Sequence, residues 1–264
     1  MKVRADVLLF RQGLAESREK AQAYILAGEV YLGQKRISKA SEMIDEEETL
    51  SIHGHRPVFA SRGGYKLEKA ISAFQADVRG AVAMDIGAAS GGFTDVLLRS
   101  GAKHVYAIDV GYGQFDWKLR NDPRVTLMER TNARLLTADM FPEQPKLTVM
   151  DVSFISIQLI LPVAAAIMGK DGRFLTLVKP QFEAGKGAVG KNGVVREASE
   201  HARVLKEIRD FAKAMGWRLQ QLTFSPIKGP AGNIEFLADI VCSEGNEITD
   251  EEILTLVNRA HHEL

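Results

Sequence analysis

The sequence predicts an α/β protein whose main domain is a doubly wound, mostly parallel sheet, preceded by a small α+β domain. An apolar run at 82–86 passes into a glycine-rich turn, and a second apolar run at 105–108 ends on the acid Asp109. Strand, glycine turn, helix and strand with a terminal acid make up the nucleotide-binding half of such a sheet. Short elements with basic residues at their turns, all before residue 54, predict the small domain.

The overall composition is that of an ordinary globular protein with one large core and a small extra module. The 264 residues carry 34 basic and 34 acidic side chains and a single cysteine, Cys242. One cysteine excludes an internal disulfide framework and a cysteine-rich zinc site, and we expect no bound metal. The sequence has neither a run of about 18 apolar residues nor an apolar signal core, so we expect no membrane span and a cytoplasmic protein.

The first domain is predicted at residues 1–55. Residues 1–40 hold eight Lys or Arg against four Asp or Glu, and residues 41–50 hold five acids and no base. A basic block on a protein without net charge indicates contact with a polyanion, although a solvated helix face explains the charge about as well. The predicted elements of this domain are helices at 5–12 and 18–27 and strands at 30–32 and 50–52.

A linker is predicted at 56–62, where Pro57 interrupts the pattern, and the second domain at 63–264. Arg62 precedes a helix that carries Lys66 and Lys69, and the i, i+3 spacing places these lysines on neighbouring faces. A lysine on an exposed helix is ordinarily solvated. The position of this helix directly before the glycine turn makes its lysines candidates for a site.

The turn after the first strand indicates which nucleotide the second domain binds. A dinucleotide loop follows the pattern G-x-G-x-x-G, but Ala89 stands two residues after Gly87. A carboxylate at Asp85 would repel a pyrophosphate, and it suits the sulfonium and ammonium groups of S-adenosylmethionine. Asp109 would accept hydrogen bonds from the ribose hydroxyls, and the alternative is a glycine turn that binds nothing. The candidate cofactor-binding residues are Asp85, Gly87, Ser90, Gly91, Gly92, Phe93, Asp109, Val110, Asn132 and Asp151.

The remaining chain continues the alternation of strands and helices. Asn132, after the third strand, is expected either to hydrogen-bond an adenine ring or to cap the next helix. The glycine-rich segment 185–193 is expected to be a substrate lid or a disordered loop. The predicted strands lie at 125–128, from 147 to an exit at 151, at 172–179, 219–225 and 234–241, and the predicted helices at 115–121, 155–168, 197–215 and behind a capping box at 249–252.

Motifs at the strand ends narrow the choice of methyl acceptor. Methylation of an exocyclic nitrogen usually goes with an Asn/Asp-Pro-Pro-aromatic loop after the fourth strand, where this chain has Asp151-Val-Ser-Phe. Methylation of pyrimidine carbon 5 needs a cysteine nucleophile, and Cys242 follows the last strand without a Pro-Cys loop. A ribose 2′-hydroxyl on RNA remains as the acceptor.

Four charged residues are predicted to converge in one cleft of the doubly wound sheet, namely Lys66, Asp151, Lys179 and Glu235. A 2′-hydroxyl is a poor nucleophile that must lose its proton during attack. A lysine accepts such a proton when a nearby cation favours its neutral form, so Lys179 is the candidate base. The other three residues would orient Lys179 and position the hydroxyl. The alternative is four unrelated surface or ion-pairing groups.

The first domain resembles the S4 RNA-binding domain over residues 3 to about 53. The matching segments are Arg4-Ala-Asp-Val-Leu-Leu, Gly13-Leu-Ala-Glu-Ser-Arg-Glu-Lys-Ala, Ile25-Leu-Ala-Gly-Glu-Val-Tyr-Leu-Gly and Lys39-Ala-Ser. Such domains contact structured RNA through its phosphates and shape. The candidate RNA contacts are Arg4, Arg18, Lys20, Lys35 and Lys39, joined by Arg62 after the linker, although a solvated surface charge explains any one of them nearly as well.

Nearly the whole chain resembles the TlyA family of ribosomal RNA 2′-O-methyltransferases, which have an FtsJ-like catalytic domain and were historically labelled hemolysin A. The resemblance lies in the four converging residues and in Ser61-Arg-Gly-Gly-Tyr-Lys-Leu, Asp85-Ile-Gly-Ala-Ala-Ser-Gly-Gly-Phe-Thr, Asp109-Val-Gly-Tyr-Gly-Gln, Asp151-Val-Ser-Phe-Ile-Ser and Lys179-Pro-Gln-Phe-Glu. It implies S-adenosylmethionine as cofactor and a cytidine ribose in ribosomal subunits as substrate. The alternatives are a membrane-active hemolysin, which the sequence supports poorly, and a catalytically inactive RNA-binding protein.

Overall fold

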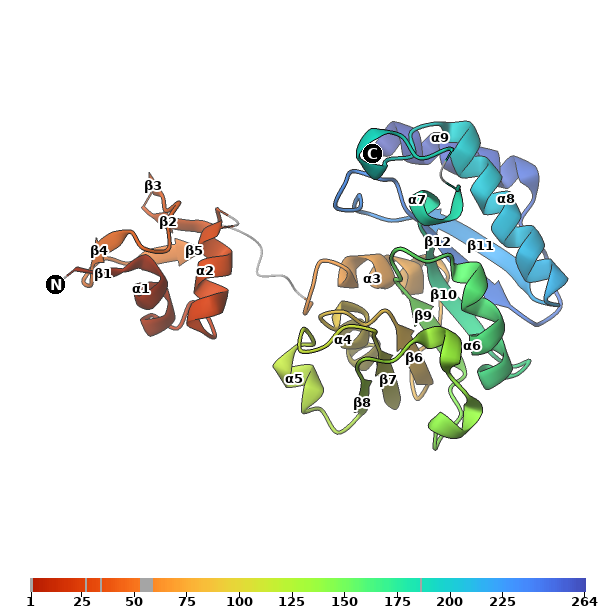
Figure 1. Ribbon diagram of the computed structural model, residues 1–264, viewed down its shortest axis with the longest axis horizontal. Coiled ribbons are helices and arrows are strands. Elements are labelled where there is room, and N and C mark those ends of the chain that lie inside the picture. Colours follow the sequence, from red (N-terminus) through yellow and green to blue (C-terminus); the bar gives the residue numbers. More distant parts are fainter. Residues whose placement is uncertain (1, 27, 34, 53–58, 186) are drawn as a thin grey trace. The chain divides into compact units, whose positions relative to one another are not determined.

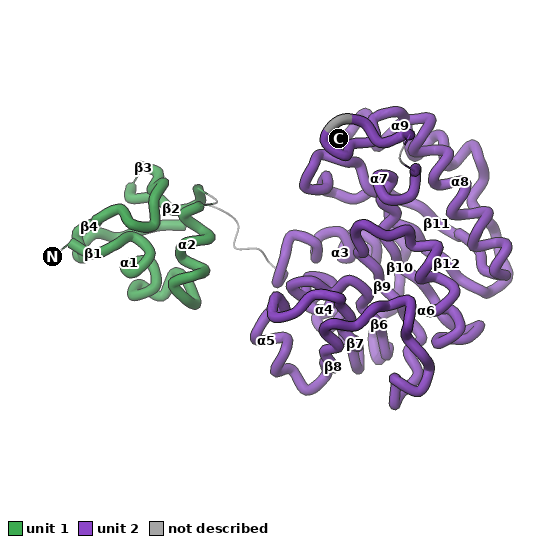
Figure 2. The backbone as a smooth tube through the Cα atoms, viewed as in Figure 1, with its two compact units in different colours: residues 1–58 green, residues 59–264 purple. Residues whose placement is uncertain are grey.

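The chain divides into two compact units, residues 1–58 and 59–264 (Figures 1 and 2). The computed structural model describes residues 2–26, 28–33, 35–52, 59–185 and 187–264. The division falls within the predicted linker at 56–62, of which residues 56–58 lie outside the described part. The predicted domain boundaries at 55 and 63 therefore stay predictions.

The first unit is a small α+β domain of two helices and short antiparallel strands. It contains β1 (Lys2–Arg4), α1 (Ala5–Arg11), α2 (Arg18–Leu26), β2 (Val30–Leu32), β3 (Lys35–Arg36), β4 (Met43–Asp45) and β5 (Leu50–Ile52). β1 pairs with β4, and β2 lies between β3 and β5. Leu9, Ile25 and Leu50 are fully buried in its core. Both predicted helices are confirmed to within a residue, and residue 27 lies outside the described part. The sequence does not predict β1 and β4, because strands this short show no clear alternation of apolar and polar residues.

The second unit is built on a seven-stranded sheet. Its strands are β6 (Val82–Ile86), β7 (His104–Ile108), β8 (Val125–Met128), β9 (Leu147–Met150), β10 (Arg173–Val178), β11 (Arg218–Phe224) and β12 (Phe236–Val241). They lie in the order β11-β12-β10-β9-β6-β7-β8. The five strands from β10 to β8 run parallel, and β12 runs antiparallel to both of its neighbours. The predicted doubly wound, mostly parallel sheet is thus confirmed.

Helices cover both faces of this sheet (Figure 1). They are α3 (Gly64–Ala73), α4 (Gly92–Arg99), α5 (Trp117–Arg120), α6 (Leu161–Met168), α7 (Pro180–Glu183), α8 (Ala198–Ala214) and α9 (Asp250–Glu263), with 3-10 turns at Ala133–Leu135, Ala138–Met140, Ile157–Leu159 and Lys191–Gly193. Successive side chains of a strand point to opposite faces. In β6, Ala83 accordingly packs in the core that contains α3 and α4, and Met84 in the core that contains α6, α8 and α9. Two covered faces explain why the parallel strands are continuous apolar runs.

Two predicted helices are shorter than expected. The helix predicted at 155–168 is divided into the 3-10 turn Ile157–Leu159 and α6. Pro162 lies in the first turn of α6, and proline favours that position because it lacks the N–H that a helix interior needs. The helix predicted at 115–121 is reduced to α5, whose N-cap is Asp116.

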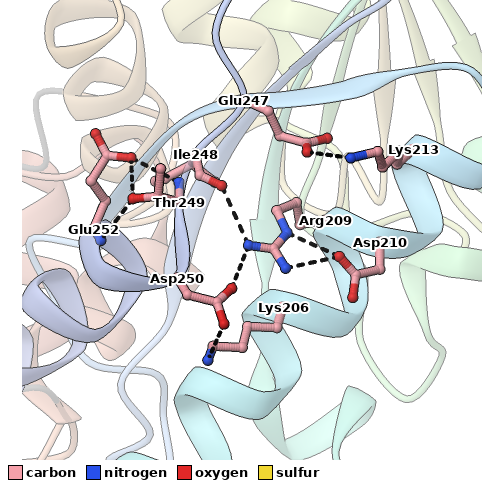
Figure 3. Close-up of polar contacts among 9 residues, drawn as sticks. All are labelled: Lys206, Arg209, Asp210, Lys213, Glu247, Ile248, Thr249, Asp250 and Glu252. Atoms are coloured by element: carbon pink, nitrogen blue, oxygen red, sulfur yellow. Dashed lines mark hydrogen bonds and ion pairs between the residues drawn. The ribbon is translucent and has the colours of Figure 1, made fainter.

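The C-terminal helix α9 is fixed to α8 by charged side chains (Figure 3). The Asp250 carboxylate forms ion pairs with Arg209 Nη1 at 2.6 Å and with Lys206 Nζ at 2.7 Å. The predicted capping box is confirmed, because the Thr249 hydroxyl accepts from the backbone N–H of Glu252 and the Glu252 carboxylate accepts from that of Thr249. The ion pairs of Asp250 hold α8 and α9 together, and the capping box stabilises the start of α9.

The topology places the predicted site residues at one edge of the sheet. The strand order reverses between β6 and β9, and ligands of such sheets bind at the carboxyl ends of the strands at this reversal. β12 is antiparallel to β10 and pairs its first residue, Phe236, with Val178 at the end of β10. Glu235, directly before β12, therefore lies at the same edge as Lys179.

Candidate active site

A cavity of about 280 Å³ opens where β6, β7 and β9 end. Five of the predicted cofactor residues line it: Gly87, Asp109, Val110, Asn132 and Asp151. Asn132 also accepts a hydrogen bond from the backbone N–H of Arg134 at 3.1 Å, so its side chain caps the next turn while it faces the cavity. The apolar part of the lining includes Ile86, Ile108, Ala133, Val152, Ile155 and Ile160.

The other predicted cofactor residues, Asp85, Ser90, Gly91, Gly92 and Phe93, are absent from the described lining of this cavity. Phe93 is a core residue that packs with α3. A Cβ at Gly92 would collide with the Ser61 hydroxyl, just before α3. Gly92 and Phe93 thus serve the close packing of α3 against α4, which the pattern of glycines alone does not distinguish from cofactor contact.

Gly87 brings two loops of the site together. Its φ is +83°, and a Cβ there would lie 2.8 Å from the backbone oxygen of Asp151. Only glycine adopts this conformation without strain and leaves this space. The turn after β6 and the loop after β9 are therefore in direct contact, which defines the width of the cavity.

Asp109 braces the turn that follows β6. Its Oδ2 accepts from the backbone N–H of Ala89 at 2.8 Å, and its Oδ1 from that of Gly111 at 2.6 Å. A carboxylate has about four lone-pair sites, and Oδ1 also accepts from Gln114 Nε2 at 3.3 Å, so Oδ2 keeps acceptor capacity. Oδ2 can still accept a ribose hydroxyl, which is the type of contact that the sequence predicts for Asp109.

Asp85 is fully buried next to the cavity. Burial raises the pKa of its carboxyl to about 7, although the Thr94 hydroxyl, which donates at 2.6 Å, opposes the shift. Within the described residues, its second oxygen has no hydrogen-bond partner. A cation bound nearby would stabilise the ionised form. The orphaned oxygen of Asp85, the acceptor capacity of Asp109 and the close approach at Gly87 together fit S-adenosylmethionine.

The four predicted catalytic residues meet beside this cavity. Lys66 Nζ lies 2.6 Å from Glu235 Oε2 and 3.5 Å from Asp151 Oδ2. Lys179 Nζ lies 2.5 Å from Asp151 Oδ1 and 3.0 Å from the Ser153 hydroxyl. The four side chains thus form a continuous row, Glu235–Lys66–Asp151–Lys179, with Asp151 shared by both lysines.

This row is almost wholly withdrawn from solvent. The side chains of Lys66, Lys179 and Glu235 are 8%, 9% and 1% exposed, and that of Asp151 is 20% exposed. Two positive and two negative charges balance, which is the condition for burying ionised groups at tolerable cost. Within the described residues, no group of three or more His, Cys, Asp or Glu is arranged to hold a metal ion.

Two further residues of the site are not predicted from sequence. Ser153 lines the cavity and contacts Lys179, and Gln181 Nε2 donates to Glu235 at 3.3 Å. Each lies two residues after a strand-end residue of the row, Asp151 or Lys179. That spacing is the only signal the sequence offers, and it does not say which way the side chain points.

The predicted RNA contacts of the first unit are partly organised by one buried acid. Asp6 accepts from Arg4 at 2.9 Å, from Gln22 at 2.8 Å and from Arg18 at 3.3 Å. Arg4 foremost holds the pKa of Asp6 well below its usual range. Lys35 pairs with Glu42 at 2.6 Å. The structure leaves Lys20 and Lys39 exposed, and it places Arg62 exposed in the second unit, just before α3.

Comparison with known proteins identifies both units. Residues 59–241 match the model of the FtsJ-like methyltransferases, and residues 3–50 match that of the S4 domain. The chain is 40% identical over 260 residues to TlyA of Mycobacterium tuberculosis, named as a 16S/23S rRNA (cytidine-2′-O)-methyltransferase, covering 98% of this chain and 97% of the relative. It is 42% identical to hemolysin A of Brachyspira hyodysenteriae, covering 90% of this chain and all of the relative.

A solved structure extends the likeness to three dimensions. A candidate hemolysin from Streptococcus thermophilus is 45% identical, with a TM-score of 0.79 over 99% of this chain and 96% of that chain. The same order of S4 and FtsJ-like domains, and relatives named TlyA and hemolysin A over nearly the full length, show that the chain belongs to the TlyA family.

Proposed function

We propose that the protein transfers a methyl group from S-adenosylmethionine to a ribose 2′-hydroxyl of ribosomal RNA, at a cytidine. Its family makes it a methyltransferase, a class whose methyl donor is S-adenosylmethionine. The observation that carries the acceptor is the buried row Glu235–Lys66–Asp151–Lys179 beside the cofactor cavity. The names of relatives from Mycobacterium tuberculosis and Campylobacter jejuni, both cytidine-2′-O-methyltransferases, support the same atom and base.

When bound, S-adenosylmethionine supplies a methyl group on a positively charged sulfur. Gly87, Asp109 and Asn132 would hold it, because they line the cavity with backbone, carboxylate and amide groups. Asp85 would stabilise its positive charge from behind this lining. These residues explain cofactor capture but do not activate the acceptor.

Activation of the acceptor falls to Lys179. Glu235 pairs with the Lys66 ammonium group at 2.6 Å, and Lys66 shares Asp151 with Lys179. A neighbouring cation favours the neutral form of a lysine. Lys179 first gives a proton to solvent, and it then takes the proton of the 2′-hydroxyl as the oxygen–methyl bond forms and the sulfur–methyl bond breaks. Ser153, 3.0 Å from Lys179 and on the cavity wall, gives that proton a route back to solvent.

The first unit binds the RNA. Its S4 match and the cluster of Arg4, Arg18 and Gln22 around Asp6 support contact with phosphates of structured RNA. We propose ribosomal subunits in the cytoplasm as the substrate particles. For the hemolysin alternative, no helix of the described residues is long and apolar enough to cross a membrane. The intact row of four charged residues argues against the alternative that the protein binds RNA without catalysis.

The deciding experiment is tritiated methyl transfer onto unmodified ribosomal subunits, followed by digestion to nucleosides. Label in 2′-O-methylcytidine supports donor, acceptor atom and base together. Label on a base, or in 2′-O-methyl forms of other nucleosides only, would contradict the acceptor. The Lys179→Ala protein serves as the control for contaminating activity, because it should bind cofactor and transfer nothing.

A further inference from the structure

The loop after β9 carries much of the active site but has little regular structure of its own. Residues 151–156 connect β9 to the 3-10 turn at Ile157–Leu159. Asp151 belongs to the row of four charges, Ser153 contacts Lys179, and five consecutive residues of the loop, 151–155, line the cofactor cavity. The positions of both the proposed base and the cavity wall therefore depend on what holds this loop.

Glu183 holds the far end of the loop. The Ser156 hydroxyl donates to Glu183 Oε2 at 2.6 Å, and the backbone N–H of Ile157 donates to Oε1 at 2.9 Å. Both carboxylate oxygens are thus committed to the loop. Both contacts are partly buried, and burial raises the pKa of this carboxyl against the opposing effect of the Ser156 and Ile157 donors.

Glu183 is itself anchored. It ends α7, the short helix that begins directly after Lys179. Arg203 of α8 donates to the backbone oxygen of Ala184 at 2.9 Å, which fixes the end of α7 to a long helix. The loop after β9 is therefore bound to the segment after β10 at both ends, by Lys179 at the catalytic end and by Glu183 at the other.

We propose that Glu183 is a positioning residue for methyl transfer, which clamps the loop at 151–157 so that Asp151 and Ser153 meet Lys179 and the cofactor cavity keeps its wall. Glu183 touches none of the groups assigned to the reaction and acts through Ser156 and Ile157. The expected effect of Glu183 on catalysis rests on the proposed function, whereas its expected effect on cofactor binding does not.

The test compares full-length Glu183→Ala, Glu183→Gln and Ser156→Ala proteins with the wild type. Glu247→Ala is the matched control, because it removes an acid that pairs with Lys213 at 2.9 Å away from the cavity (Figure 3). We expect Glu183→Ala to lower kcat by about 10- to 100-fold, since misplacement by about 1 Å can reduce rates about 100-fold. Glu183→Gln keeps an acceptor for Ile157 and a donor for Ser156, and we expect it to stay within about fivefold of wild type. Ser156→Ala should lower kcat by less than Glu183→Ala does.

Binding of S-adenosylmethionine, measured by calorimetry without RNA, separates this inference from the proposed function. Glu183→Ala should weaken binding at least about fivefold, because the clamped loop forms the cavity wall. That loss would support the clamp even if the wild type proved to methylate another acceptor. If Glu183 has only a structural role, Glu183→Ala should lower the melting temperature. Its kcat per folded molecule and its affinity for cofactor should then both equal those of Glu247→Ala. That result would overturn the inference, as would an equal loss in Glu183→Gln and Glu183→Ala.

Discussion

The buried carboxyl of Asp85 makes the stability of the second unit depend on pH. Its pKa rises from 3.8 to about 7 on folding because burial penalises the charged form. Below pH 3.8 the Asp85 carboxyl is protonated in both the folded and the unfolded chain and does not destabilise the folded state. Between pH 3.8 and about 7, only the unfolded chain releases the proton, so rising pH lowers the free energy of unfolding by about 1.4 kcal/mol per unit. Above about pH 7 the destabilisation is complete, at about 4 kcal/mol.

Replacement of Asp85 with Asn removes the titrating group and keeps its shape. Urea unfolding of the wild-type and Asp85→Asn proteins at several pH values measures the difference, and fluorescence reports on the second unit because both tryptophans, Trp117 and Trp217, lie there. The stability of the wild type relative to Asp85→Asn should fall by about 3 to 4 kcal/mol between about pH 4 and about pH 8. Asp171→Asn, at a side chain 90% exposed, is the control.

Two outcomes would refute this reasoning. A stability difference that does not change with pH would mean that Asp85 titrates alike in both states. A wild type that gains stability relative to Asp85→Asn as the pH rises would mean that the folded protein prefers the carboxylate. Saturating S-adenosylmethionine should flatten the wild-type dependence, because a bound cation stabilises the ionised form.

Three further predictions concern the site and the first unit. Lys179→Arg should keep a cation beside Asp151 and bind cofactor normally but lower methyl transfer at least about 1000-fold, because arginine does not give up its proton; near-normal transfer would remove Lys179 as the base. Asp109→Ala should weaken S-adenosylmethionine binding about 10- to 100-fold in calorimetry, since it loses the ribose acceptor and the brace on Ala89; unchanged affinity would show that the cofactor lies elsewhere. Deletion of residues 1–58 should leave a folded unit that binds cofactor but captures ribosomal RNA at least about tenfold more weakly in a filter-binding assay, and equal RNA affinity would contradict the role of the S4 domain.

Sequence patterns predict most of the architecture because the buried strands of a parallel sheet are mostly apolar runs. The run at 82–86 is buried throughout and mostly apolar, since helices cover both faces, and its bounds are confirmed, as are those of the strand at 125–128. The convergence of Asp151 and Lys179 is also predictable, because the carboxyl ends of parallel strands share one edge. What the sequence does not reveal is the placement of side chains in irregular segments. Glu183 and Ser156 lie 27 residues apart, and their contact depends on how the loop after β9 turns.

Glu235 shows how the last step depends on tertiary structure. It precedes a strand, and the start of a parallel strand would place it at the opposite edge of the sheet from Lys179. It reaches the active site because β12 inserts antiparallel between β10 and β11. In the structure its carboxylate lies 2.6 Å from Lys66 Nζ. Strand patterns alone do not reveal the direction of β12, and that direction is what brings Glu235 to this edge.

The buried row of charges is poorly explained as a device for stability. Desolvation of an ion pair can exceed the attraction it gains, and well-packed apolar residues often replace such pairs without loss. Here four ionisable side chains from α3 and from the ends of three strands are withdrawn from water at a single point. Lys66→Met would leave Glu235 buried without its cation, and we expect the free energy of unfolding to fall by about 3 to 5 kcal/mol, whereas joint replacement of Lys66 and Glu235 by Met and Leu should restore most of it. A double variant that is stable, binds cofactor and transfers no methyl group would show that chemistry, and not folding, is what the row provides.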